Sequence, residues 1–321
     1  MKAFFENKLN IILTCIAIVL IITGVAIGVT VGSRTNKDSE VANTEVENNQ
    51  ITLLCMGVDK QVAMDERHPE TNSIGQADAI FLMQIDTVTK DVDIVAIPRD
   101  TIVTIEKYNH KMQYMGMEEA QICLQYAYAD GMEYSSELTV DRVEELFPKT
   151  NIDAYVSINV QAIIEMNDVV GGIDVVVNDE YTATHLGIEP DSELHLEGDT
   201  AMLYLRLRDK EASGSAYTRM DRIKEYITLF IPQALSVVKD NPGIIAEMYK
   251  SLQEHMVTDV ELADMVELLL ALKDINMENI SFQTLQGEIV LGEDGYEEFY
   301  PDEQQLQTLQ EKFANKSHET D

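Results

Sequence analysis

The sequence of 321 residues contains no tryptophan, only three cysteines and few basic residues. Its 23 lysines and arginines stand against 57 aspartates and glutamates, which gives a formal net charge of −34. A surface this acidic repels polyanions, and no basic helix-turn-helix pattern is present. We therefore expect no nucleic-acid partner.

The scarce cysteines and histidines exclude several kinds of site. No CxxC or Cys/His spacing indicates a zinc site, and no GxSxG accompanies the histidines, so a hydrolytic triad has no support. We expect His185 and His195 to be surface loop residues. We also expect Cys55 and Cys123 to be buried thiols, although the sequence leaves a disulfide between them open.

The chain also lacks charge between residues 9 and 33, where isoleucine, leucine, valine, alanine and glycine dominate. A helix of about 20 apolar residues spans a bilayer core, so this segment predicts a transmembrane signal anchor. Residues 1–8 would be a cytoplasmic tail, residues 34–50 a flexible polar stalk, and residues 51–321 an extracellular domain. The predicted location is the cell membrane, with a single pass and the bulk of the chain outside the cell.

Periodicity in residues 51–321 predicts an α/β protein. The fold class we expect is a three-layer α/β/α sandwich around a mixed central sheet. Strands are expected at residues 51–58, 79–85, 92–97, 154–158, 173–177 and near 280. Helices are expected at residues 117–129, 139–146, 160–170, 199–206, 219–238 (with Pro232 kinking or interrupting it), 244–256, 259–272 and 302–313.

Charged side chains stand at or near the ends of three predicted strands, where α/β proteins usually bind ligands. Asp59 and Asp78 could hold Mg²⁺, which takes one or two carboxylates together with substrate phosphates. In so acidic a chain, solvated strand-end carboxylates are the alternative. The sequence IPRDT at residues 97–101 places Arg99 and Asp100 at a strand tip, and a turn with a local ion pair is the alternative there.

Four arginines gather in a short stretch of this acidic chain: Arg206, Arg208, Arg219 and Arg222. Arg219 and Arg222 share a face if they are helical, and Arg206 and Arg208 point the same way in an extended chain. Arginine binds phosphate in a fork-like manner, so the cluster predicts a phosphate site. Pairing with surface carboxylates is the alternative.

Several segments, taken in order, resemble motifs of the LytR-CpsA-Psr family. The resemblance covers roughly residue 51 to the end, and the predicted anchor and stalk match as well. The IPRD segment is quite specific when it occurs together with an Arg-x-Arg pair and a later Arg-x-x-Arg pair. The matching segments are LLCMGVD (53–59), QADAIFLMQID (76–86), VDIVAIPRDTIVTI (92–105), LQYAYADGMEYSSELTVDRVEELF (124–147), VSINVQAIIEMNDVVGGIDVVV (156–177), LEGDTAMLYLRLRDK (196–210), TRMDRI (218–223) and GEDGYEEFYPDEQQLQTLQEKF (292–313).

The resemblance implies a function and partners. Members of the family transfer anionic glycopolymers, such as teichoic acid or capsular polysaccharide, from a polyprenyl pyrophosphate carrier to peptidoglycan. An apolar cavity between sheet and helices would take the polyprenyl tail. The implied site comprises Mg²⁺ on Asp59 and Asp78, catalytic Arg99 and Asp100, and a pyrophosphate site of Arg206, Arg208, Arg219, Arg222 and Gln76.

The chain departs from the family pattern at three places. Gln76-Ala77-Asp78-Ala79 stands where the family usually has Arg-Ser-Asp-Thr, Ile223-Lys224 stands where it has Gln-Gln, and Ala216-Tyr217 replaces a usual acidic residue. Two hypotheses follow: an active Mg²⁺-dependent phosphotransferase, or a non-catalytic, membrane-anchored relative that binds polyprenyl phosphate lipid or wall polymer in a regulatory role. Gln76 is the residue that distinguishes the two hypotheses, because it cannot supply the positive charge of the arginine that the family usually has there.

Overall fold

The computed structural model describes residues 49–70, 72–207, 215–272, 277–293 and 295–315. The predicted anchor and nearly all of the predicted stalk lie outside these ranges, as do Arg208 and the side chains of Arg206 and Arg219. Within the described ranges, no helix is both long and apolar enough to cross a membrane.

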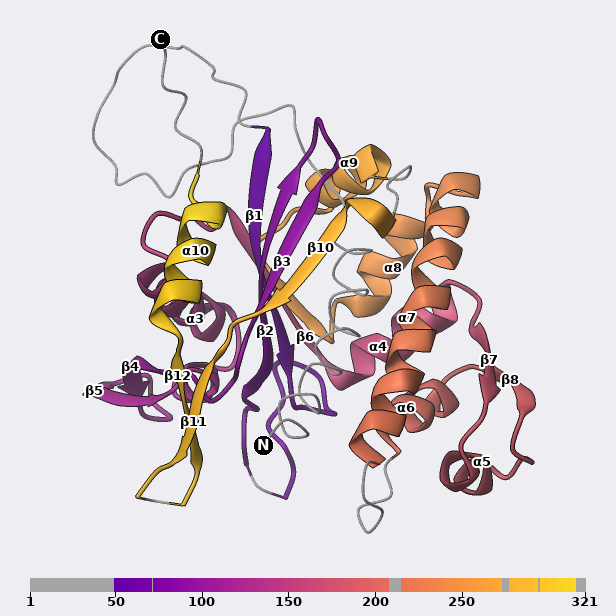
Figure 1. The fold of residues 1–321 in the computed structure, drawn as a ribbon, viewed down its shortest axis with the longest axis horizontal. Coiled ribbons are helices and arrows are strands. Elements are labelled where there is room, and N and C mark those ends of the chain that lie inside the picture. The colour runs from indigo at the N-terminus through magenta and orange to yellow at the C-terminus, as the bar shows by residue number, and fades with distance from the viewer. Residues whose placement is uncertain (1–48, 71, 208–214, 273–276, 294, 316–321) are drawn as a thin grey trace.

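A six-stranded sheet forms the centre of the molecule (Figure 1). Its strand order is β10-β3-β2-β1-β6-β9. The pairs β1–β6 and β10–β3 are parallel and the other three are antiparallel, which confirms the predicted mixed sheet. The strands are β1 (Gln50–Val58), β2 (Ala77–Asp86), β3 (Val92–Ile97), β6 (Ala154–Asn159), β9 (Met256–Thr258) and β10 (Ile280–Thr284).

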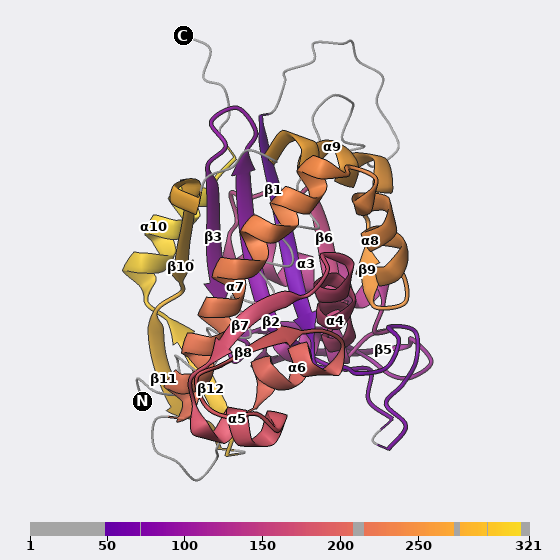
Figure 2. The ribbon, with the colours of Figure 1, turned by 90° about the vertical axis from the view of Figure 1, so that its right-hand side faces the viewer.

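Helices cover both faces of this sheet, because its strands are apolar on both sides (Figures 1 and 2). In β1, Leu53 and Cys55 belong to one hydrophobic cluster, whereas Leu54 and Met56 belong to the other. The first cluster packs under α4 (Val160–Val169), α6 (Asp199–Arg206), α7 (Ser215–Asp240), α8 (Ile244–Leu252) and α9 (Leu262–Leu272). The second packs under α2 (Cys123–Ala127), α3 (Glu133–Leu146) and α10 (Glu303–Phe313).

Three two-stranded sheets project from this frame. They are β4 (Ile102–Tyr108) with β5 (Tyr114–Gln121), β7 (Ile173–Val177) with β8 (Ser192–Leu196), and β11 (Gly287–Leu291) with β12 (Glu297–Pro301). The sheets β4–β5 and β11–β12 meet where β3 ends, since Thr101 bridges to Phe299 and the Phe299 N–H donates to the Asp100 carbonyl at 2.8 Å. The short helices α5 (Glu180–Leu186) and η1 (Met277–Asn279) complete the described elements.

The helix predicted over residues 117–129 is wrong. Its first half is strand β5, which pairs with β4 in a ladder that places Met117 opposite Glu106, and only Cys123–Ala127 is helical. Met117 is 58% exposed, so the apolar spacing that indicated a helix does not mark a buried helix face. The helix predicted over residues 219–238 is present as α7. Pro232 does not interrupt this helix, since α7 continues through the proline.

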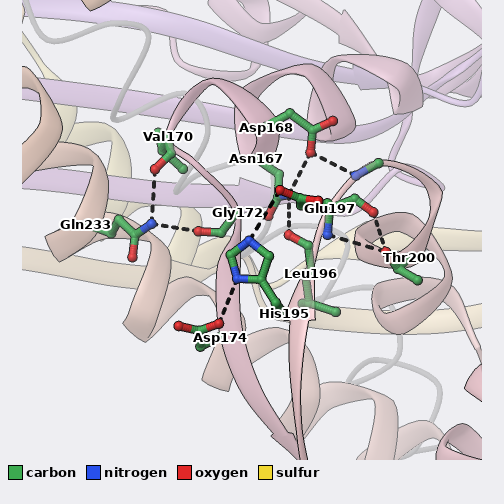
Figure 3. Close-up of polar contacts among 11 residues, drawn as sticks. Asn167, Asp168, Val170, Gly172, Asp174, His195, Leu196, Glu197, Thr200 and Gln233 are labelled. Atoms are coloured by element: carbon green, nitrogen blue, oxygen red, sulfur yellow. Dashed lines mark hydrogen bonds and ion pairs between the residues drawn. The ribbon is translucent and has the colours of Figure 1, made fainter. Parts of the chain in front are cut away.

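The β7–β8 hairpin is attached to α4 and α7 through backbone carbonyls (Figure 3). The Gln233 amide of α7 donates to the carbonyls of Val170 and Gly172, at 3.0 and 2.6 Å, and the Asn167 amide donates to the Leu196 carbonyl at 2.8 Å. His195 lies on this hairpin with its Nδ1 2.7 Å from Asp174.

Both histidines singled out in the sequence are exposed as predicted. They lie in regular structure and not in loops, since His185 is in α5 and His195 is in β8.

Candidate active site

The ends of three neighbouring strands bring the predicted polar residues together at one edge of the sheet. Asp59 follows β1, Asp78 is the second residue of β2, and Arg99 follows β3 after Pro98. Because β2 runs antiparallel to both neighbours, its amino end lies beside the carboxyl ends of β1 and β3. The order and direction of β1, β2 and β3 therefore bring Asp59, Asp78 and Arg99 together, as the sequence indicated.

Arg99 is the centre of this cluster. Its Nη1 forms an ion pair with the Asp78 carboxylate, its Nη2 donates to Gln76 Oε1 at 3.2 Å, and its Nε lies 3.3 Å from Asp100 Oδ1. The side chains of Arg99, Asp78 and Asp100 are 29%, 24% and 11% exposed. The guanidinium is thus a partly buried cation, balanced by two carboxylates and still accessible to solvent.

Asp59 is fixed to the start of β2 by backbone hydrogen bonds. The Gln76 N–H donates to Asp59 Oδ1 at 2.7 Å, and the Asp59 N–H donates back to the Gln76 carbonyl at 3.1 Å. Gly75, which precedes this exchange, has φ of +88°, and a Cβ there would lie 2.6 Å from Val58 Cγ1. Only glycine tolerates both the left-handed backbone and this close approach.

Cys123 is a neighbour of the cluster that the sequence did not place there. Its Sγ lies 3.9 Å from Gln76 Oε1, and its N–H donates to the Arg99 carbonyl at 3.1 Å. Cys55 and Cys123 are both buried thiols, as predicted. The Gln76 amide oxygen therefore accepts from a cation and from a thiol, which orients it toward Arg99.

Lys60 is the second residue that sequence reasoning missed, because a lysine in an acidic chain is expected on the surface. Its side chain is buried, and its ammonium donates to the Met64 carbonyl at 2.5 Å. Burial lowers the pKa of Lys60. Asn159, at the end of β6, donates to the Val62 carbonyl at 2.7 Å, so the loop after Asp59 is held at two points.

The donor set at this edge fits one kind of metal site. The described residues contain no group of three or more His, Cys, Asp or Glu side chains that could hold an ion. Asp59 and Asp78 supply two carboxylates, which is the number Mg²⁺ commonly takes when substrate phosphates complete its coordination. The residues therefore suit a Mg²⁺ shared with a phosphate ligand and do not suit an all-protein cage.

Arg222 is the one member of the arginine group whose side chain the structure describes. Its Nε donates to the Tyr204 carbonyl at 2.9 Å, its Nη1 lies 2.8 Å from Asp179 Oδ2, and its Nη2 donates to the Leu207 carbonyl. The side chain is 7% exposed. Each nitrogen of its guanidinium thus already donates to an acceptor of the protein itself.

Comparison with known proteins identifies the family. A sequence model described as the LytR_cpsA_psr family matches residues 18–315. The chain belongs to the LytR-CpsA-Psr family. This confirms the resemblance carried by the strand-end and arginine motifs.

Named relatives within the LytR-CpsA-Psr family are similar at low identity. The polyisoprenyl-teichoic acid–peptidoglycan teichoic acid transferase TagU of Bacillus subtilis is 25% identical over 239 residues, which is 72% of this chain and 66% of the relative. The transferase of the same name from Enterococcus faecalis is 27% identical over 242 residues, covering 75% and 73%. The chain thus spans about two thirds of the Bacillus relative that it matches.

Solved structures share the LytR-CpsA-Psr fold with this chain. The protein gbs0355 of Streptococcus agalactiae superposes with a TM-score of 0.62 at 22% identity, covering 83% of this chain and 87% of that one. TagV of Bacillus subtilis superposes with a TM-score of 0.58 at 21% identity, covering 84% and 97%. These likenesses concern the fold alone.

Proposed function

We propose that this protein transfers an anionic glycopolymer from a polyprenyl pyrophosphate carrier to peptidoglycan. The observation that carries the proposal is the cluster of Arg99 with Asp78, Asp100 and Gln76, beside Asp59, in a chain of the LytR-CpsA-Psr family. The names of the relatives, which are teichoic acid transferases acting on polyisoprenyl-linked substrates, support the substrate class. The partners would be the lipid-linked polymer, peptidoglycan and membrane lipid.

Each residue has a role in this proposal. Asp59 and Asp78 would hold Mg²⁺, and the ion when bound would neutralise charge on the pyrophosphate oxygens. Arg206, Arg208 and Arg219 would bind the pyrophosphate, because guanidinium groups match phosphate oxygens in pairs. Arg99 would stabilise charge that develops in the transition state, with Asp100 setting its orientation through the contact at Nε.

The reaction is a phosphoryl-type substitution. A hydroxyl oxygen of a peptidoglycan sugar forms a bond to the phosphorus that carries the polymer, and the bond from that phosphorus to the bridging oxygen breaks. Polyprenyl phosphate leaves with the bonding electrons, and the hydroxyl proton passes to a carboxylate of the cluster or to water. Such a step requires positioning and charge neutralisation more than covalent catalysis, and a partly exposed arginine among carboxylates is suited to both.

The proposal includes the location of the protein. Residues 9–33 would anchor the chain in the cell membrane, with residues 51–321 outside the cell, where peptidoglycan is. Fusion of a reporter enzyme to the carboxyl terminus tests this orientation. Reporter activity on the cytoplasmic side would contradict it.

A second candidate function is favoured by one specific observation. Arg99 is surrounded by acceptors of the protein itself, and Gln76, which is one of them, brings no charge to bind phosphate. A non-catalytic, membrane-anchored relative that binds polyprenyl phosphate lipid or wall polymer in a regulatory role would have such a site. Two variants separate the two functions. A large gain in transfer in Gln76→Arg would mean that the natural protein is weakened or non-catalytic, whereas a fall of an existing activity in Gln76→Ala would give the glutamine a direct role in transfer.

The experiment that tests the proposed function uses the full chain purified in detergent. Release of polyprenyl phosphate from a polyprenyl pyrophosphate oligosaccharide is measured with peptidoglycan, with and without Mg²⁺. We expect metal-dependent release that Asp78→Ala abolishes and that Arg99→Ala lowers about 100-fold or more. Arg67→Gln, which removes an exposed arginine in the loop before β2, should leave release unchanged. Binding without turnover in the unaltered protein would contradict the transferase and support the second candidate.

A further inference from the structure

Arg222 joins three elements on the helical face that contains α6 and α7. It belongs to α7, and its guanidinium contacts two carbonyls at the end of α6 together with the side chain of Asp179. Asp179 is also the N-cap of α5, because its Oδ1 accepts from the Thr182 N–H at 2.8 Å. One side chain therefore connects the end of one helix to the start of another.

The environment of Arg222 shows why these contacts are strong. The side chain is buried and lies over the ring of Tyr204, with 5.7 Å from the guanidinium carbon to the ring centroid. The Tyr204 hydroxyl in turn donates to Glu225 Oε2 at 2.9 Å. A buried guanidinium that loses its acceptors is costly, so the carbonyls and the guanidinium hold one another in place.

The carbonyls of Tyr204 and Leu207, which accept from Arg222, lie at the end of α6. α6 ends at Arg206, and Leu207 is its C-cap residue in an extended conformation, with φ of −55° and ψ of 134°. Leu207 stands between Arg206 and Arg208, two of the residues assigned to the pyrophosphate. Because Arg222 binds the carbonyl of Leu207, it holds the residue at which α6 ends.

We infer that Arg222 is a positioning residue, which holds the backbone at the end of α6, where Arg206 stands, and does not itself bind the pyrophosphate. The inference rests on the proposed function for the identity of the ligand. The structural part of the inference is that Arg222 holds the end of α6, and it depends only on the contacts of Arg222. The two parts can therefore fail separately.

Three variants test the inference in the full chain. Arg222→Gln removes the charge and two of the three donor nitrogens, and Arg222→Lys keeps the charge without the planar fork. Lys239→Gln removes one charge from an exposed site on the last turn of the same helix. We expect the Kd for inorganic pyrophosphate and the KM for the lipid-linked donor to rise about 100-fold in Arg222→Gln, the size of effect that small misplacements produce. Arg222→Lys should lie between Arg222→Gln and the unaltered protein, and Lys239→Gln should match the unaltered protein.

Two further readouts separate positioning from direct binding and from a general loss of structure. Amide hydrogen exchange in Arg222→Lys should accelerate at residues 199–207 and stay unchanged in the central sheet. Unchanged exchange at the end of α6 together with weakened pyrophosphate binding would overturn the inference, because Arg222 would then bind the ligand itself. Faster exchange throughout the sheet would also overturn it, since the residue would then support the whole fold. If the unaltered protein binds no pyrophosphate, the proposed function fails. The exchange data then still decide whether Arg222 holds the end of α6.

Discussion

Replacing Arg99 by alanine should reduce transfer far more than it reduces stability. The guanidinium faces two carboxylates, and all three side chains retain access to water, at 29% exposure for Arg99, 24% for Asp78 and 11% for Asp100. Solvent screening limits the contribution of such pairs, so we expect a loss of about 1 kcal/mol in the free energy of unfolding. For a domain of this size that corresponds to a fall of about 2–4 °C in Tm.

The effect on catalysis should be much larger. Removal of one preorganised group that stabilises developing charge typically lowers kcat by about 10²–10³-fold. Arg99→Lys should keep part of the activity, because an ammonium keeps the charge but cannot contact Asp78, Gln76 and Asp100 at the same time. The assay is release of polyprenyl phosphate at saturating donor, with Tm measured on the same samples by differential scanning fluorimetry.

Two results would refute this reasoning about Arg99. If Arg99→Ala keeps more than about a third of the unaltered kcat, the guanidinium does not stabilise the transition state to the extent expected of such groups. If activity falls only in proportion to the fraction unfolded, Arg99 has a structural role. Arg67→Gln serves as the matched control, since it removes an exposed arginine whose side chain donates to the Asn72 carbonyl.

Three further predictions concern groups near or outside this cluster. Gly75→Ala should lower the free energy of unfolding by about 1–3 kcal/mol, because of the left-handed φ and the contact with Val58, and it should lower transfer as well; urea titration and the transfer assay measure both effects. Burial lowers the pKa of Lys60 in the folded state, so the charged form destabilises the fold below that pKa, and this penalty is relieved as pH rises toward 10.5. Urea titrations at increasing alkaline pH should therefore show the unaltered protein gaining stability relative to Lys60→Met. Asp174 raises the pKa of His195, so Asp174→Asn should move that pKa down toward 6.5 in an NMR titration.

Each of these predictions has a clear contrary outcome. An unchanged urea midpoint in Gly75→Ala would mean that the turn before β2 adjusts without cost. A pH-independent difference between the unaltered protein and Lys60→Met would mean that the ammonium is solvated. The ion pair at His195 should stabilise the fold below pH 6.5 and lose this effect as pH rises through the raised folded-state pKa; an unshifted pKa in Asp174→Asn would contradict this.

Much of the central sheet could be predicted from the sequence, because its strands are short apolar runs that end at charged residues or proline. The runs at residues 51–58 and 92–97 became β1 and β3 almost residue for residue. Their ends supply Asp59 and Arg99, so the candidate site followed from the strand boundaries. The hairpin β4–β5 was missed because Tyr114, Met115 and Met117 of β5 are exposed, so these apolar residues follow no alternating pattern that marks a buried face.

The roles of buried polar residues could not be predicted in the same way. Lys60 and Arg222 are charged residues in an acidic chain, and nothing in their spacing distinguishes a buried cation from a solvated one. Lys60 donates to the Met64 carbonyl, which is only four residues away in the sequence. The acceptors of Arg222 come from distant segments of the chain, such as the carbonyl of Tyr204 and the carboxylate of Asp179. Long-range contacts of this kind are a property of the fold and leave no local signal in the sequence.

The stoichiometry of the reaction distinguishes polymer transfer from simple hydrolysis of the lipid-linked donor. The full chain is incubated with a radiolabelled polyprenyl pyrophosphate glycopolymer, purified peptidoglycan and Mg²⁺, and both released polyprenyl phosphate and peptidoglycan-bound label are counted. We expect one polyprenyl phosphate to be released for each polymer attached, and both products to be lost in Asp78→Ala. Release of polyprenyl phosphate with no label on peptidoglycan, or attachment that persists in Asp78→Ala, would contradict it.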